Sequence, residues 1–154
     1  MQRQSLIGIL ILTHGELGGK FIETARLIGL NSEERVSAVS IDPSASPDAL
    51  RGQIGKAIKC INGGRGVLIL TDLFGGTPTN LSLSFLEEGR VEVVTGLNLP
   101  MMIKAVNSRE NHDLATLAKL TTDAGKESIY LAGELFRQRT VDRSDKRNPK
   151  FRKE

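Results

Sequence analysis

Four short apolar runs alternate along the chain with segments that have helical spacing. The runs cover residues 6–12, 36–41, 66–71 and 91–95. Short strand-like runs separated by helical patterns are typical of βαβ units, which build a parallel sheet with helices on both faces. The first and third runs are nearly continuous in apolar residues, as buried central strands are. We therefore expect these two strands to lie side by side.

Five segments between and after these runs predict helices. In the first, Leu17, Phe21, Ala25 and Ile28 recur at helical spacing. Proline near the start and glycine after the last turn delimit others, with Gly125 as the expected end of the fifth. The predicted helices cover residues 17–28, 47–61, 78–88, 99–106 and 112–124.

These elements predict one doubly wound α/β domain with a mostly parallel four-stranded sheet in the order 2-1-3-4. Right-handed crossovers permit this order, which places the switch point of the topology between the carboxyl ends of the first and third strands. Ligands of such sheets bind at that point. Residues 128–131 form a further strand-like segment. It needs a partner, which a second chain could supply, because an unpaired strand exposes backbone donors and acceptors.

Composition narrows the class of protein. A length of 154 residues gives room for one domain and one active centre. The single cysteine, Cys60, excludes an internal disulfide, and the N-terminus lacks the pattern of a secretory signal, so we expect a cytoplasmic location. The longest apolar stretch is far below the ~20 residues of a membrane helix, so we expect a soluble protein without membrane insertion.

Charge is distributed unevenly along the chain. Residues 137–154 contain eight lysines or arginines and three acidic residues, a net charge of +5, whereas residues 1–136 contain 13 basic and 15 acidic residues, a net charge of −2. A general nucleic-acid binder would spread its basic surface over the fold, so we expect no nucleic-acid partner. We divide the chain into a domain over residues 1–135 and a basic tail over 136–154, which is either disordered or a docking arm.

Candidate chemistry lies directly after the first and third predicted strands. His14 and Gly15 follow the first strand, and the run D-L-F-G-G-T-P over residues 72–78 follows the third. Parallel strands end at the same edge of a sheet, so we expect His14 and Asp72 to project into one crevice. In each of the two loops, glycine and then the start of a predicted helix follow.

This pairing suits a reversible phosphohistidine. Neutral imidazole is a good nucleophile, and a carboxylate that accepts a hydrogen bond from one ring nitrogen leaves the lone pair on the other. Asp72 is the candidate orienting group for His14. Gly75, Gly76 and Thr77 precede or begin a helix, where backbone N–H groups and a hydroxyl can receive phosphoryl oxygens. No metal or cofactor is required.

A purely structural interpretation remains open from spacing alone. A histidine in a β–α loop is often a surface or capping residue, and G-G-T-P is a common turn into a helix.

Three stretches, taken in order, resemble the enzyme IIA component of the mannose family of the bacterial sugar phosphotransferase system. They are T-H-G after the first strand, T-D-L-F-G-G-T-P-T-N after the third, and T-G-L-N-L-P-M-M over residues 95–102. Each stretch alone is weak, but together at these separations they are highly specific. The resemblance covers roughly residues 5–135.

The resemblance implies a phosphotransferase that accepts a phosphoryl group on His14 from the phosphohistidine of the carrier protein HPr. Asp72 would hold the ring. The glycine-rich turn would lie near the phosphoryl group, and further residues would form the rim of the site. The turn comprises Gly75, Gly76 and Thr77, and the expected rim comprises Gly15, Leu73, Phe74, Asn98 and Pro100.

The resemblance also implies partners. Family members form homodimers that exchange a C-terminal strand, which matches residues 128–131. Family transporters can continue through an Ala/Pro-rich linker into a IIB domain, whereas here a basic tail follows. We therefore expect the acceptor to be a separate IIB protein or a regulatory target.

Two other classes of function share part of this pattern. T-H-G-E resembles the R-H-G motif of histidine phosphatases, in which water takes the phosphoryl group, but position 13 is threonine and the other histidine, His112, begins a predicted helix. A non-catalytic module that binds a phosphorylated metabolite is the third class. Neither G-x-x-x-x-G-K-[ST] nor G-x-G-x-x-G occurs to support it.

Overall fold

The structure, a computed structural model, describes residues 5–147. Its strands are β1 (Gly8–His14), β2 (Val36–Ile41), β3 (Val67–Thr71) and β4 (Val91–Thr95). They form one sheet in the order β2-β1-β3-β4, and each neighbouring pair is parallel. The predicted strand order and the central position of the first and third strands are therefore confirmed.

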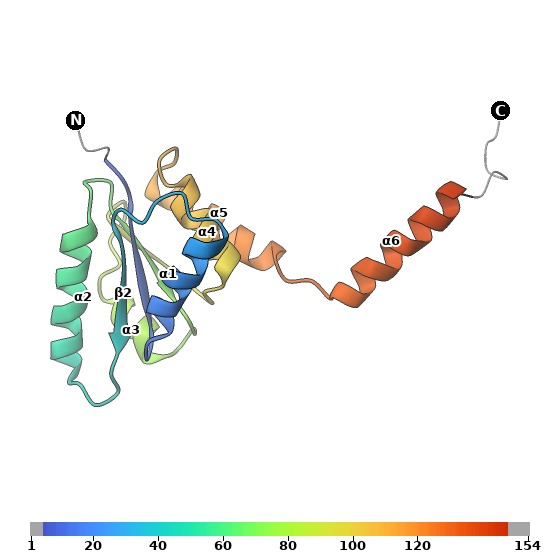
Figure 1. The fold of residues 1–154 in the computed structure, drawn as a ribbon. Coiled ribbons are helices and arrows are strands. Elements are labelled where there is room, and N and C mark those ends of the chain that lie inside the picture. The colour runs from blue at the N-terminus through green and yellow to red at the C-terminus, as the bar shows by residue number, and fades with distance from the viewer. Residues whose placement is uncertain (1–4, 148–154) are drawn as a thin grey trace.

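Helices cover both faces of the sheet. The face opposite α2 carries α1, α4 and α5, while α3 packs with α2, and α6 extends away from the sheet (Figure 1). Among residues 5–147, no helix has both the length and the apolar composition needed to cross a bilayer. The helices are α1 (Leu17–Ile28), α2 (Pro47–Ile61), α3 (Thr77–Leu83), α4 (Leu99–Ser108), α5 (Leu114–Glu127) and α6 (Ala132–Arg147).

The alternation of side chains along β1 divides the core into two layers. Ile9 and Ile11 pack on the side of α1, α4 and α5, whereas Leu10 and Leu12 pack on the side of α2 and α3. All four side chains are fully buried. A strand that is covered on both faces must be apolar at successive positions, which explains the nearly continuous apolar run seen in the sequence.

Two helices end at positions that differ from the prediction. Helix α3 ends at Leu83 rather than at residue 88, because the chain turns there and Glu87 forms an antiparallel bridge with Val91. Helix α5 continues through Gly125 to Glu127, so Gly125 is not its end. A Cβ on Gly125 would lie 2.7 Å from Sδ of Met101, so the glycine serves close packing of α4 against α5.

The segment after α5 also differs from the prediction. Residues 129–131 form no strand within this chain, and their apolar side chains are exposed. Within residues 5–147, no strand lies beside this segment, which connects α5 to α6. The predicted domain boundary after residue 135 falls inside α6. This helix lacks an apolar stripe, but it contains good helix formers such as Glu134, Leu135 and Gln138. Residues 148–154 of the predicted tail lie outside the described residues.

Candidate active site

Parallel pairing of the two central strands brings His14 and Asp72 together. Leu12 of β1 is paired with Thr71 of β3, so the chain emerges from both strands at the same edge of the sheet. His14 is the last residue of β1, and Asp72 directly follows β3. Nδ1 of His14 lies 2.9 Å from Oδ2 of Asp72. The two side chains thus meet at the switch point of the topology, as expected.

The carboxylate of Asp72 is held by three hydrogen bonds. Its Oδ2 accepts from the backbone N–H of His14 at 2.9 Å as well as from the ring, and its Oδ1 accepts from the backbone N–H of Leu73 at 2.9 Å. An ionised carboxylate only accepts hydrogen bonds, so the ring proton of His14 lies on Nδ1. The lone pair of the neutral ring is therefore on Nε2.

The two side chains differ in exposure. The side chain of His14 is 45% exposed, whereas that of Asp72 is 14% exposed. The ring therefore covers the carboxylate and presents its other side to the surroundings. A neutral ring in this position is open to a reaction partner, while the group that orients it is protected from competing water.

Opposing effects act on the pKa of Asp72. Burial would raise this pKa, but the hydrogen bonds donated by the backbone and ring of His14, its charge, and the backbone N–H of Leu73 together outweigh burial. The net result is a pKa below the ordinary value. The lowered pKa favours the carboxylate form of Asp72, which is the form that accepts the hydrogen bond from Nδ1 of His14.

The glycine-rich turn approaches the free edge of the ring. A Cβ on Gly76 would lie 2.8 Å from Cε1 of His14 and 3.3 Å from Nε2. Only glycine leaves this space open. Gly75 has a φ of +80°, a conformation that glycine adopts without strain and that the tight turn requires. Thr77 begins α3. Gly76 is the N-cap of α3 and provides no side-chain cap.

The predicted rim residues fall into two groups. Gly15, Leu73 and Phe74 lie in the same two loops as the histidine and the aspartate, and all three are exposed. Asn98 has a different role in the fold: its Oδ1 caps α4 by accepting from Met101, and its Nδ2 donates to the carbonyl of Gly125. Pro100 is an exposed residue in the first turn of α4.

Sequence reasoning missed three buried threonines that support the two loops. Oγ1 of Thr13 accepts a hydrogen bond from the backbone N–H of Gly18 at 2.8 Å, which fixes the start of α1 after His14. Thr71 and Thr79 contact each other through their hydroxyls at 2.7 Å beneath the Asp72 loop. For Thr13 and Thr71 the available signal was a polar residue at the end of each apolar central strand, where burial requires a hydrogen-bond partner.

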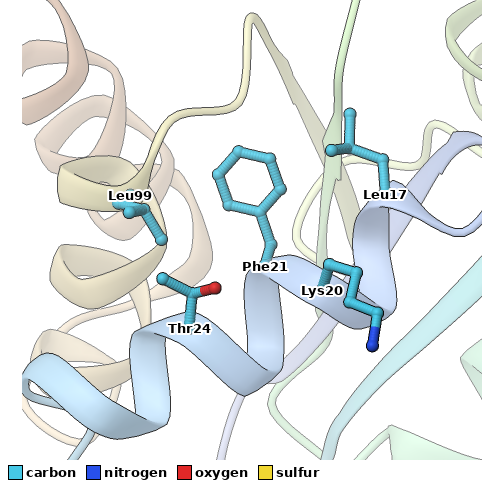
Figure 2. Close-up of a pocket in the computed structure, with 5 residues that line it drawn as sticks. All are labelled: Leu17, Lys20, Phe21, Thr24 and Leu99. Carbon is cyan, nitrogen blue, oxygen red and sulfur yellow. The ribbon is translucent and has the colours of Figure 1, made fainter.

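An apolar pocket of about 160 Å³ lies between α1 and α4. Leu17 and Phe21 on α1 and Leu99 on α4 contribute to its lining (Figure 2). Neither His14 nor Asp72 lines it, so the pair is presented at the edge of the sheet rather than inside this pocket. Among the described residues, no group of three or more His, Cys, Asp or Glu side chains could hold a metal ion.

The second histidine lies at the other end of the sheet. His112 precedes α5 and donates from Nδ1 to the carbonyl of Ser108 at 2.9 Å. Its own carbonyl accepts from Arg65, which lies just before the amino end of β3. Asp72 follows the carboxyl end of the same strand, so His112 and the His14–Asp72 pair are separated by its length.

Fold and site together define a doubly wound α/β domain with a histidine–carboxylate pair at its switch point. Residues 8–121 match the family model EIIA-man, described as "PTS system fructose IIA component". The chain belongs to this family and is a IIA component of the sugar phosphotransferase system (PTS).

Individual relatives agree with this assignment. The chain is 28% identical over 130 residues to the PTS system fructose-specific EIIA component of Bacillus subtilis, covering 84% of this chain and 88% of the relative. It is 27% identical over 125 residues to the PTS system mannose-specific EIIAB component of Escherichia coli K12. That match covers 80% of this chain but 38% of the E. coli protein. The chain therefore corresponds to only part of the E. coli relative.

A solved structure confirms the fold. The phosphotransferase system component EIIA of Streptococcus agalactiae superimposes with a TM-score of 0.74 at 26% sequence identity. The match covers 83% of this chain and 98% of the streptococcal one.

We predict that the Asp72 carboxyl titrates below its ordinary pKa of 3.8. Because folding favours the charged form, its contribution to the free energy of unfolding is fully present above the unfolded pKa and is lost as the pH falls through the lowered folded pKa. Carboxyl ¹³C NMR measures the folded value, and Asp72→Asn should remove this part of the acid dependence. A folded pKa at or above the ordinary value would contradict the prediction.

Proposed function

We propose that His14 accepts a phosphoryl group on Nε2 from the phosphohistidine of HPr and passes it to a IIB-type protein or to a regulatory target. The observation that carries this proposal is the hydrogen bond between Nδ1 of His14 and Oδ2 of Asp72. It leaves the lone pair on Nε2, in a ring that a partner protein can reach. Family membership supports the same reaction class, with HPr as the donor and a IIB-type protein as the acceptor.

In the proposed step, the lone pair of Nε2 attacks the phosphorus. The new P–N bond forms as the P–N bond to the donor histidine breaks, and the donor ring leaves with that electron pair. His14 keeps its proton on Nδ1, so the phosphorylated ring carries a positive charge. The carboxylate of Asp72 faces this charge across a hydrogen bond and stabilises it. Transfer to the acceptor is the same step in reverse.

The glycine-rich turn would receive the phosphoryl oxygens. Gly76 lies against the edge of the ring that carries Nε2, and Thr77 offers a hydroxyl and a backbone N–H next to it. We assign phosphate binding to Gly75, Gly76 and Thr77 on this basis. Gly15, Leu73 and Phe74, together with Asn98 and Pro100, would form the surrounding rim that partner proteins contact.

The two alternative functions lack comparable support. A histidine phosphatase of the R-H-G type needs a second histidine at the phosphate, but His112 lies near the amino end of β3. Thr13, which occupies the position of the motif's arginine, is buried and engaged with Gly18. A module that merely binds a metabolite has no need for a carboxylate-oriented histidine.

We predict that His14→Ala abolishes phosphorylation when the protein is mixed with enzyme I, HPr and phosphoenolpyruvate. The wild-type chain should acquire an acid-labile, base-stable phosphate, since phosphohistidine has that stability. His112→Ala, at the second of the chain's two histidines, is the matched control and should retain the label. Label that survives in His14→Ala, or that disappears only in His112→Ala, would refute the assignment.

Asp72→Asn serves as a graded test in the same assay. Hydrogen bonds to charged groups contribute about 1.5–3 kcal/mol, which corresponds to a rate reduced by about ten- to a hundredfold. An unchanged rate would remove Asp72 from the mechanism.

We predict that Gly76→Ala slows phosphorylation of His14 while the fold persists. The backbone at Gly76 (φ −78°, ψ 168°) suits any residue, but a Cβ would lie 2.8 Å from Cε1 of His14 and must displace the ring. We expect a rate at least about tenfold lower. Alanine is a poorer N-cap than glycine, so the free energy of unfolding should fall, but by no more than about 1 kcal/mol.

Gly19→Ala is the matched control for this substitution. It adds the same methyl group to α1, where a Cβ meets no atom within 4 Å. Its rate should equal that of the wild type. Equal rates for both variants would show that the phosphorylation rate does not depend on the open space between Gly76 and the ring of His14.

We also propose that the chain forms a homodimer in which residues 128–131 pair with a second copy. Ile129, Tyr130 and Leu131 are exposed in the single chain at 77%, 64% and 66%. Burying apolar side chains of this size would favour association. Sedimentation equilibrium of the full chain should give twice the monomer mass, and replacing Ile129 and Leu131 by serine should shift it toward the monomer. A wild-type monomer at high concentration would exclude the dimer.

A further inference from the structure

We infer that Thr79, a buried residue of α3, is a positioning residue that sets the orientation of the Asp72 carboxylate through the backbone of Leu73. The inference rests on the proposed function, because the group that Asp72 orients is the proposed phosphoryl acceptor, His14. Thr79 itself need not contact the phosphoryl group.

Apolar packing contributes little to the position of the loop that carries Asp72. Leu73 and Phe74, the two residues that follow Asp72, are 62% and 74% exposed, so apolar packing does not fix this part of the loop. Gly75 adds a residue without a side chain. Yet the carboxylate must keep its position within a few tenths of an ångström if it is to orient the ring of His14. Hydrogen bonds from below must therefore supply the rigidity.

Thr79 provides the anchor. Its side chain is 1% exposed, and its hydroxyl donates a hydrogen bond of 2.7 Å to the carbonyl of Leu73. The backbone N–H of Gly76 approaches the same carbonyl at a longer 3.4 Å. The Thr79 hydroxyl therefore makes the shorter of these two hydrogen bonds that hold the Leu73 carbonyl.

The donor in each hydrogen bond of Thr71 and Thr79 follows from the fact that a hydroxyl has a single proton to donate. A carbonyl can only accept, so the single hydroxyl proton of Thr79 is committed to Leu73. The hydroxyl of Thr71, 2.7 Å away and fully buried, must then donate to Oγ1 of Thr79. The sequence of donors thus runs from the end of β3, through α3, to the loop.

The same residue connects the anchor to the carboxylate. While the carbonyl of Leu73 accepts from Thr79, its backbone N–H donates to Oδ1 of Asp72 at 2.9 Å. The other oxygen, Oδ2, accepts from the backbone and ring of His14. The carboxylate is therefore fixed between the N–H groups of Leu73 and His14. Displacing Leu73 would rotate the carboxylate away from the geometry that keeps the ring proton on Nδ1.

The test compares three variants of the full chain. Thr79→Val keeps the shape of the side chain but removes its hydroxyl. Thr79→Ser restores the hydroxyl. Thr71→Val is the matched control: it also removes a buried hydroxyl, but it leaves the proton of Thr79 free to donate to Leu73.

Two quantities are measured for each variant. One is the rate of phosphorylation by phospho-HPr, and the other is the distribution of the ring proton of His14 between Nδ1 and Nε2 in the unphosphorylated protein, from ¹⁵N NMR of the ring. A change in global stability alone would not move the second quantity. Urea unfolding checks that each variant is folded under the conditions of the assay.

We expect Thr79→Val to lower the rate between about tenfold and a hundredfold, as displacements of about 1 Å near a reacting group do. The ring of His14 should change from the single Nδ1–H form to a mixture. Thr79→Ser should restore both quantities, and Thr71→Val should stay close to the wild type in both.

Two outcomes would overturn the inference. One is a Thr79→Val protein with the wild-type ring spectrum, because the carboxylate would then not depend on the hydroxyl. The other is equal changes in Thr79→Val and Thr71→Val that follow only the loss of stability. A wild-type protein that takes up no phosphoryl group would instead refute the proposed function, and the ring spectra would still decide the role of Thr79.

Discussion

The hydrogen bond between His14 and Asp72 depends on the pairing of β1 with β3. The two residues are 58 positions apart, and only the parallel register that sets Leu12 beside Thr71 brings them to the same edge of the sheet. Oδ2 of Asp72 accepts hydrogen bonds from both the ring and the backbone of His14, so a small displacement of either loop would break one of them. A register slip of one residue would turn these side chains to opposite faces. The apolar side chains packed on both sides of β1 oppose such a slip, because it would rearrange them.

The site combines two requirements that oppose each other. In the proposed function, His14 must be exposed to exchange a phosphoryl group with other proteins, but Asp72, which orients its ring, must be held in place and largely shielded from water. The fold meets both requirements by placing the two groups at different depths below the surface. Exposed side chains such as Leu73 and Phe74 lie outermost, Asp72 lies behind the ring, and the buried hydroxyls of Thr71 and Thr79 lie beneath the loop. Polar groups at that depth cost stability unless they are paired, and here each is paired with the next.

The sequence predicted those features that follow from periodicity and from the geometry of parallel sheets. Uninterrupted apolar runs identified the two central strands, and their common carboxyl edge located the contact of His14 with Asp72. Features decided by tertiary contacts were not predictable. Gly125 has the signature of a helix end, but it lies inside α5 because Met101 needs the space. Thr79 follows Pro78 and reads as an ordinary first-turn residue, since its partner Thr71 is found only once the strand and the helix pack together.

In the proposed phosphoryl transfer, the charge of Asp72 would matter more than its hydrogen bond. The hydrogen bond from Nδ1 would be present with or without a phosphoryl group on Nε2, so the part of its energy that does not depend on charge would cancel between the two proposed states. What differs is the positive charge of the phosphorylated ring, which only an ionised carboxylate stabilises. The lowered pKa of Asp72 favours that ionisation, and it arises because hydrogen bonds from His14 and Leu73 outweigh the effect of burial. Under the same proposal, partial exposure of the ring would moderate this stabilisation and leave the phosphoryl group transferable.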